Sequence, residues 1–280
     1  MKFWKMNGAG NDFIIINNIE EKLQYEQFPT IAATLCERHM SIGADGIMVV
    51  DKADGDADFK MTYYNSDGSL GEMCGNGARC ICRYGYEVGL AGETQKVQVT
   101  AGIVTGQRIT EQLYKIRLND PSVIELDYPI EIDGRTYECS YVELGNPGLP
   151  HAVVPISGLK DYPSRDLFDL GRKMRYCSRF PKGANVNFYE IVGKDEIIEK
   201  TYERGVEDFT YACGTGTGSM VTVLALKGKV SSSKDVDVNV AGGELKVTVD
   251  REDRKVKNIF LTGPTNIVAK GQVTDENLSL

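Results

Sequence analysis

The sequence predicts an α/β protein (of the α+β type) in which two similar domains each surround one helix with short strands. Three observations support this fold class. Runs of β-branched and aromatic residues bounded by Gly or Asp recur through the 280-residue chain, which is typical of strands. Few helical patterns interrupt these runs. Two of the helical patterns follow closely similar cysteine–glycine loops, one in each half of the chain.

The individual elements follow from these patterns. Strands are expected over residues 13–17, 46–51, 59–65, 96–100, 137–144, 152–156, 185–191, 236–240 and 245–249. Helices are expected over 30–38 and 167–174, from Ala78 onward, and from Gly218 to 226. Residues 219–226 are apolar nearly all round, so we expect this last helix to be buried on every side. A domain boundary is expected near Asn119-Asp120-Pro121.

Composition excludes several classes of function. The net charge of −8 argues against nucleic acid as a partner, because phosphate binding favours a basic surface. The sequence has no run of about 18 apolar residues that would predict a membrane span. The first residues lack the apolar region of a secretory signal. Seven cysteines, an odd number, favour free thiols in a reducing cytoplasm over a disulfide framework.

The two cysteine loops are the most informative motifs. They read Met73-Cys74-Gly75-Asn76-Gly77-Ala78-Arg79 and Ala212-Cys213-Gly214-Thr215-Gly216-Thr217-Gly218. A thiol at a helix start can have its pKa lowered from ~8.5 toward ~7, and backbone N–H groups freed by glycine can bind a carboxylate. Two such thiols suit removal of a proton from one face of a carbon and its return to the other.

Other interpretations of these cysteines fit less well. One such loop alone would more often be a packing feature, since cysteine is frequently buried, but two matched loops favour function. Neither loop has the lysine of a phosphate-binding P-loop, and Cys80 replaces the third glycine of a dinucleotide fingerprint. The sequence has no C-x-x-C pair suited to zinc. The remaining cysteines are expected to be packing residues: Cys36, Cys80, Cys82, Cys139 and Cys177.

These motifs resemble those of the diaminopimelate epimerase family, enzymes that interconvert LL- and meso-diaminopimelate without a cofactor. The similarity extends over nearly the whole chain. It is carried by the two loops above together with Met6-Asn7-Gly8-Ala9-Gly10-Asn11-Asp12-Phe13, Asn65-Ser66-Asp67-Gly68-Ser69, Gly145-Asn146-Pro147, Asn185-Val186-Asn187-Phe188 and Tyr202-Glu203-Arg204-Gly205.

The resemblance implies a fold and a cellular context. Each domain would be a mixed, mostly antiparallel sheet around a central helix, with domains at 1–118 and 119–262 and the tail 263–280 returning to the first. The active site would lie in the cleft between the domains. The family further implies a cytoplasmic homodimer in lysine and peptidoglycan precursor synthesis. Its partner would be a small amino-acid substrate, with no metal, cofactor, nucleic acid or membrane.

The resemblance also implies roles for individual residues. Cys74 and Cys213 would be the acid/base thiols. Gly75-Asn76 and Gly214-Thr215 would bind the reacting carboxylate through their backbone. The polar contacts to the substrate would come from Asn11, Asn65, Asn146 and Asn185. Glu203 would pair with the reacting ammonium, Arg204 would anchor the distal carboxylate, and His151 would lie near the thiols.

The sequence departs from the family pattern in three places. Gly148-Leu149-Pro150 separates Pro147 from His151, where the family usually has histidine directly after proline. Asn7 stands where many members have histidine. Thr217-Gly218-Ser219 replaces a common Ala-Cys-Ala. Three alternatives therefore stay open at this point: a racemase of another amino acid such as histidine, a non-catalytic amino-acid binder, and a dithiol redox protein.

Overall fold

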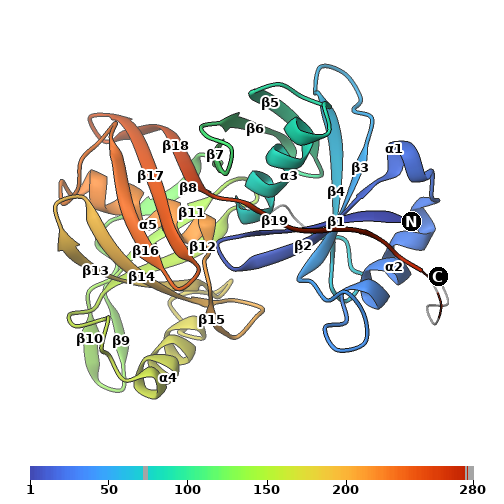
Figure 1. Cartoon of the computed structure of the whole chain (residues 1–280). Coiled ribbons are helices and arrows are strands. Elements are labelled where there is room, and N and C mark those ends of the chain that lie inside the picture. The colour runs from blue at the N-terminus through green and yellow to red at the C-terminus, as the bar shows by residue number, and fades with distance from the viewer. Residues whose placement is uncertain (72–74, 275, 277–280) are drawn as a thin grey trace. The chain divides into compact units, whose positions relative to one another are not determined.

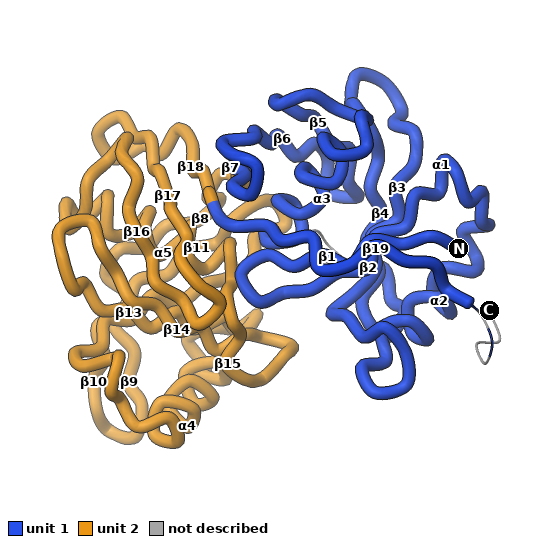
Figure 2. Tube along the Cα trace, in the orientation of Figure 1, with its two compact units in different colours: residues 1–116, 263–280 blue, residues 117–262 orange. Residues whose placement is uncertain are grey.

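A computed structural model describes residues 1–71, 75–274 and 276, so Cys74 lies outside the described residues. The chain forms two compact units (Figure 2). Unit 1 comprises Met1–Ile116 together with Gly263–Leu280, and unit 2 comprises Arg117–Thr262.

Unit 1 is a mixed sheet with a long helix on one face and a short helix on the other. Its strands are β1 (Lys2–Gly8), β2 (Asn11–Asn17), β3 (Gly46–Asp51), β4 (Phe59–Asn65), β5 (Thr94–Val99), β6 (Gly102–Arg108), β7 (Leu113–Arg117) and β19 (Asn266–Gln272). Its helices are α1 (Asn18–Glu21), the 3-10 turn η1 (Tyr25–Gln27), α2 (Phe28–Leu35) and α3 (Gly75–Glu87). The order is β19-β1-β2-β3-β4-β5-β6-β7, with β2–β3 and β4–β5 parallel and the other pairs antiparallel.

Strand alternation explains how β2 serves both faces of this sheet. Ile14 and Ile16 are fully buried in a cluster with α2, while their neighbours Phe13 and Ile15 point to the opposite face. On that face α3 packs against β1, β2 and β6 (Figure 1). Gly85 of α3 makes this close packing possible, because a Cβ there would lie 2.5 Å from the Phe59 ring.

Unit 2 has the same kind of architecture. Its strands are β8 (Pro121–Glu125), β11 (Ser140–Leu144), β12 (Leu149–Pro155), β13 (Asn185–Gly193), β14 (Glu196–Glu203), β15 (Asp208–Thr210), β16 (Asp235–Val240), β17 (Gly243–Glu252) and β18 (Lys255–Pro264), with β9 (Ile130–Ile132) and β10 (Arg135–Tyr137) as a separate hairpin. Its helices are α4 (Ser164–Arg175) and α5 (Gly214–Leu226). The main order is β8-β11-β12-β13-β14-β16-β17-β18, with β12–β13 and β14–β16 parallel.

Helix α5 is the centre of unit 2. It packs against β11, β12, β13 and β17, and nearly all of its residues are buried (Figure 1). An apolar helix buried on every side needs strands all round it, which is what the sequence of 219–226 predicts. Helix α4 covers the other face, where Leu167 and Met174 pack against Val186 and Phe188.

The two units repeat one pattern of strand pairings in the same order. Phe13 opposite Gly46 begins the β2–β3 pair, and His151 opposite Asn185 begins the β12–β13 pair. Helices α3 and α5 each begin at the glycine after the loop cysteine and each span 13 residues. Residues of β2, β3, β4 and α3 therefore have equivalents in β12, β13, β14 and α5.

Several expected element boundaries were wrong. The central helices begin at Gly75 and Gly214 rather than at Ala78 and Gly218, because glycines in a first turn carry no apolar periodicity. The expected strand 137–144 divides after Tyr137, where the chain leaves the β9–β10 hairpin before β11 begins. The helix expected over 30–38 ends at Leu35.

Nine strands were not anticipated from the sequence. They are β1, β6, β7, β8, β9, β14, β15, β18 and β19. Several of them are largely polar or expose much of their length, so the apolar runs used to find strands were absent. In β19, for instance, only Ile267 is partly buried and the other residues are exposed.

Candidate active site

Cys213 is the N-cap residue of α5 and is 7% exposed. Its carbonyl oxygen accepts the first helical bond from the Thr217 N–H at 2.9 Å. Its sulfur lies 3.5 Å from the Thr215 hydroxyl oxygen. The thiol is therefore held at the positive end of a buried helix, with Gly214 and Thr215 forming the first turn.

The pKa of the Cys213 thiol is raised above its ordinary value. Burial is the main cause and the Glu203 carboxylate adds to it, while hydrogen bonds from Thr215 and Gly216 act in the lowering direction. The expectation that a helix start lowers this pKa was therefore wrong for Cys213, because loss of water outweighs the helix dipole. The raised pKa favours the protonated form of the Cys213 thiol at neutral pH.

Gly216 lies where no side chain could fit. A Cβ at this position would come within 2.0 Å of the Asn187 amide oxygen and 3.3 Å of the Cys213 sulfur. Asn187 is fully buried on β13, so the glycine lets a strand side chain reach the helix start. Close packing against protein therefore accounts for this glycine, in addition to any approach of a ligand.

Asn185, Glu203 and Arg204 come together where β13 begins and β14 ends. The Asn185 side-chain oxygen accepts the Arg204 backbone N–H at 2.8 Å. The Arg204 guanidinium donates to the Lys182 carbonyl oxygen at 2.9 Å. The negative charge of Glu203 contributes to the raised pKa of the Cys213 thiol. The Glu203 carboxylate thus acts on the thiol, whereas the charge of the neighbouring Arg204 acts on His151.

His151 is completely buried on β12, beside Asn185 in the parallel register. Burial, with a smaller contribution from the Arg204 charge, lowers the pKa of its imidazole to about 3. Its Nδ1 lies 3.3 Å from the Asn187 amide nitrogen, which fits a neutral ring accepting at Nδ1. A catalytic role for His151 stays a prediction, and at neutral pH it would be that of an uncharged ring.

The candidate residues of unit 1 form a second hydrogen-bonded group. Asn76, in the first turn of α3, donates to the Asn11 side-chain oxygen at 2.6 Å and accepts from Arg79 at 2.7 Å. Asn11 donates in turn to Asp45 at 3.0 Å. Asn76 and Arg79 are both buried. The turn after Gly75 is therefore fixed by side chains from the strand and from the helix itself.

Of two further predicted contact residues, Asn65 ends β4 and Asn146 lies in a turn. The Asn65 side chain donates to the Ser69 hydroxyl oxygen at 2.9 Å, and its backbone N–H bonds the Ser69 carbonyl at 2.8 Å. Asn146 is exposed at the tip of the β11–β12 hairpin, next to a cis bond to Pro147. The inserted residues Gly148 to Pro150 continue this hairpin into β12, and so place His151 within a strand.

Sequence reasoning missed a layer of buried polar side chains beneath Cys213. It comprises Asn187, Glu199, Thr201 and Thr217. Thr201 donates to the Asn187 oxygen at 3.1 Å, and Thr217 contacts Glu199 at 2.6 Å. The available signal was the alternation in β14, where Glu199 and Thr201 share the inward side with apolar Ile197.

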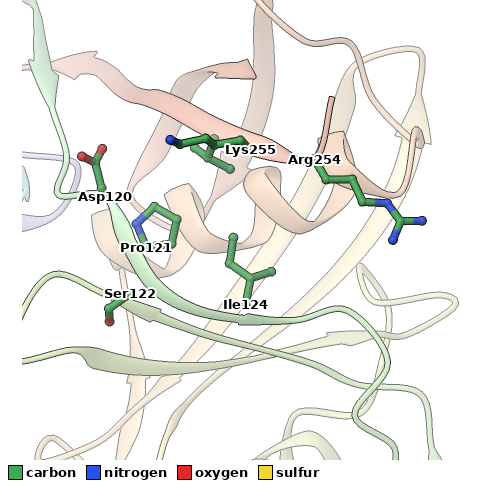
Figure 3. Close-up of a pocket in the computed structure, with 7 residues that line it drawn as sticks. Asp120, Pro121, Ser122, Ile124, Arg254 and Lys255 are labelled. Carbon is green, nitrogen blue, oxygen red and sulfur yellow. The ribbon is translucent and has the colours of Figure 1, made fainter. Parts of the chain in front are cut away.

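Two surface hollows are lined by none of these candidate residues. One pocket of unit 2, of about 400 Å³, is lined by Asp120, Pro121, Ser122, Ile124, Arg254, Lys255 and Val256 (Figure 3). One pocket of unit 1 involves Tyr25 and Lys60. Within the described residues, no group of three or more His, Cys, Asp or Glu could hold a metal ion, and no helix is long and apolar enough to cross a membrane.

The other cysteines serve packing. Cys36, Cys80, Cys82 and Cys139 are buried, as expected, and Cys177 is partly buried. Burial raises the pKa of Cys82 to about 12, and that of Cys36 and Cys139 to about 12 as well. A raised pKa keeps these thiols protonated at neutral pH, and the protonated form is not the nucleophile.

The fold is shared with known proteins of the racemase and PhzF type. A PhzF-family phenazine biosynthesis protein from Bacillus anthracis superposes with a TM-score of 0.73 at 15% identity, covering 98% of both chains. A probable proline racemase from Agrobacterium radiobacter K84 gives 0.71 at 16% identity, covering 99% of this chain and 94% of that one. These similarities confirm the fold class expected from the sequence.

Sequence similarity is more specific. The diaminopimelate epimerase family profile matches residues 3–116 and 144–268. The diaminopimelate epimerase of Aquifex aeolicus is 38% identical over 99% of both chains, and that of Archaeoglobus fulgidus is 36% identical over 96% of this chain and 95% of its own. The chain belongs to the diaminopimelate epimerase family.

Proposed function

We propose that this protein is an isomerase that interconverts LL- and meso-diaminopimelate by moving a proton at the α-carbon without a cofactor. The observation that carries the proposal is Cys213 at the N-terminus of buried α5, in a chain similar to diaminopimelate epimerases over its full length. A thiol at that position can exchange a proton while neighbouring N–H groups bind a carboxylate. The pathway would be lysine and peptidoglycan precursor synthesis.

The two loops would act on one substrate from opposite faces. Cys74 would remove the α-proton as the thiolate and Cys213 would return one as the thiol, with these roles exchanged in the reverse direction. The raised pKa of Cys213 supports the acid role for this residue. Backbone N–H groups after each cysteine, from Gly75-Asn76 and Gly214-Thr215, would stabilise the charge that develops on the carboxylate.

The remaining contacts would distinguish the two ends of the substrate. Glu203 would pair with the reacting ammonium, since it lies near the Cys213 thiol. Arg204 would bind the distal carboxylate, and its guanidinium is already oriented by the Lys182 carbonyl. Polar contacts would come from Asn11, Asn65, Asn146 and Asn185, and His151 would support the site as a neutral ring. We further propose that the protein is cytoplasmic and forms a homodimer. Sedimentation of the purified chain would test the dimer.

A deuterium exchange experiment tests this function directly. The protein is incubated with LL-diaminopimelate in deuterated water, after exhaustive treatment with a chelator. We expect deuterium at the α-carbon and formation of the meso isomer, with no absorbance from a pyridoxal aldimine. A panel of L-amino acids including L-histidine serves as the control. Exchange into histidine, or into another amino acid but not diaminopimelate, would assign the protein to a racemase of that substrate.

A further inference from the structure

Glu199 is a carboxyl group buried beneath the candidate thiol. It lies on the inward side of β14 and is 2% exposed. Its Oε2 is 2.6 Å from the Thr217 hydroxyl oxygen. Within the described part of the chain, Oε1 has no hydrogen-bond partner. A carboxyl group removed from water with one oxygen unpaired is a costly feature, and nothing in the proton transfer described above uses it.

Thr217 connects this carboxyl group to Cys213. The Thr217 hydroxyl oxygen lies 3.0 Å from the Cys213 carbonyl oxygen, one turn earlier in α5. A hydroxyl has one hydrogen, so it can donate to Glu199 or to Cys213 but not to both. With Glu199 neutral, the acid donates to Thr217 and Thr217 donates to Cys213. With Glu199 ionised, Thr217 turns to the carboxylate and the Cys213 carbonyl keeps only its helical bond.

The surroundings of Glu199 contain no compensating cation in the described residues. Tyr189 lies opposite it on β13, and burial raises the pKa of that phenol to about 12. Cys213, at the start of α5, feels the Glu199 charge, which acts in the raising direction on the pKa of that thiol. His151 on β12, whose Nδ1 lies 3.3 Å from the Asn187 amide nitrogen, is a neutral ring. Burial raises the pKa of Glu199 to about 8, although the Thr217 hydrogen bond acts in the lowering direction. The carboxyl group is thus uncharged at pH 7.

We propose that Glu199 is a positioning residue for Cys213, a neutral acid that orders Thr217 and the first turn of α5 and, once ionised, places a buried negative charge beneath the thiol. The proton lost on ionisation goes to solvent. The charge would hold Cys213 in its protonated form at alkaline pH, because a nearby anion disfavours a thiolate. The inference uses the proposed function only in treating Cys213 as the reacting thiol.

Alkylation of Cys213 by iodoacetamide tests the proposal without any substrate. Rates are measured on the Cys213 peptide by mass spectrometry in the full chain, for the parent, Glu199→Gln and the control Glu196→Gln. Glutamine can still donate to Thr217 but cannot ionise, whereas Glu196 is an exposed residue of the same strand. At pH 9 we expect Glu199→Gln to react about three- to tenfold faster than the parent, since one pKa unit is tenfold in thiolate.

The same measurement at pH 6.5 should show no such difference, because Glu199 is then neutral in the parent. Glu196→Gln should follow the parent at both pH values. Equal rates for the parent and Glu199→Gln at pH 9 would overturn the proposal. The assay contains no diaminopimelate, so its result does not depend on whether the protein has the proposed epimerase activity.

Infrared spectroscopy supplies a second readout. The parent should show the carbonyl band of a buried protonated carboxylic acid at pH 6.5, and this band should disappear as the pH rises through about 8. Glu199→Gln should lack the band. Thr217→Ser keeps the hydroxyl and should preserve the titration, while Thr217→Val should shift it upward because the hydrogen bond that lowers the pKa is lost. A band unaffected by Glu199→Gln would reject the assignment.

Discussion

Units 1 and 2 build the same framework but line it differently. In unit 1 the strand residues on the α3 side of the sheet include Phe13, Met48 and Met61, and the first turns of α3 include Ala78; all four are buried. The equivalent positions around the start of α5 carry His151, Asn187, Glu199 and Thr217, also buried. The equivalence follows from the register, since Met48 lies opposite Tyr63 and Asn187 opposite Thr201.

This difference distinguishes residues that specify the fold from residues that adjust the chemistry of a site. Strand order and register are the same with an apolar layer and with a polar one, so the layer is not needed to specify the backbone. The polar layer is hydrogen-bonded from Asn187 to Thr201 and from Glu199 to Thr217. Buried polar groups cost stability unless they are paired, and the residues of unit 1 equivalent to Asn187, Glu199 and Thr217 are apolar, which points to a role for these three beside Cys213.

The largest effect should come from the cysteines, which the two units share. We expect Cys74→Ala and Cys213→Ala each to lower the epimerisation rate by about 10²- to 10⁴-fold, the range for loss of general acid–base catalysis. The chirality of the product and solvent exchange at the α-carbon measure this loss. Unchanged far-ultraviolet circular dichroism is the control for folding. Near-normal turnover in either variant would show that the two loops are not equivalent in function.

Arg204→Met probes a charge that only unit 2 carries at this position. Its removal would leave the distal carboxylate unpaired at a cost of about 2–5 kcal/mol, so catalytic efficiency on diaminopimelate should fall about 30-fold or more. The equivalent residue of unit 1, one past the last residue of β4, is Ser66. Ser66→Ala is therefore the matched control and should retain efficiency within about twofold. Steady-state kinetics that ranked the two variants equally would remove Arg204 from substrate binding.

An exchange of residues between the layers tests why they differ. Met61→Glu would bury a carboxyl group in unit 1, where Ala78 offers no hydroxyl in place of Thr217. We expect it to lower the free energy of unfolding by about 1–3 kcal/mol. Glu199→Met should cost less, since Thr217 keeps its bond to the Cys213 carbonyl. Urea unfolding at pH 7 measures both. A smaller loss for Met61→Glu than for Glu199→Met would contradict this account of the layers.

The smallest effect is a pH dependence of stability that comes from Glu199 in the polar layer and from His151 beside it. The pKa of Glu199 rises from 4.5 to about 8 on folding, so its stabilising contribution is present below pH 4.5 and is lost as the pH rises toward 8. The pKa of His151 falls from 6.5 to about 3, so its contribution is present above pH 6.5 and is lost as the pH falls toward 3. The two slopes oppose each other between pH 4.5 and 6.5.

Above pH 6.5 only the Glu199 slope remains. The free energy of unfolding of the parent, relative to Glu199→Gln, should then decrease by up to about 1.4 kcal/mol per pH unit until pH 8. Denaturant unfolding at pH 6.5, 7.25 and 8 measures this difference. Glu196→Gln serves as the reference for an exposed carboxylate. A constant difference between parent and Glu199→Gln over this range would mean that Glu199 is already ionised.

Much of the chain could be predicted from sequence because apolar periodicity and motif chemistry are local. Patterns of neighbouring residues predict the strand Phe13 to Asn17, the buried helix ending at Leu226 and the cysteine at the start of that helix. Largely exposed strands such as β19 were missed, because their partners across the sheet, and not their composition, make them strands. The roles assigned to the candidate site residues stay predictions.

By itself, then, the sequence determined the fold class, the family and the two thiol-bearing loops, since each depends on residues adjacent in the chain. Tertiary structure decided the protonation of the groups around Cys213, because burial by distant strands sets the cost of charge there. It raised the pKa of Cys213 where the helix start alone predicts a lower one. It also brought Glu199 to Thr217, an acid and a hydroxyl that strand alternation and helix packing place together and that no local pattern connects.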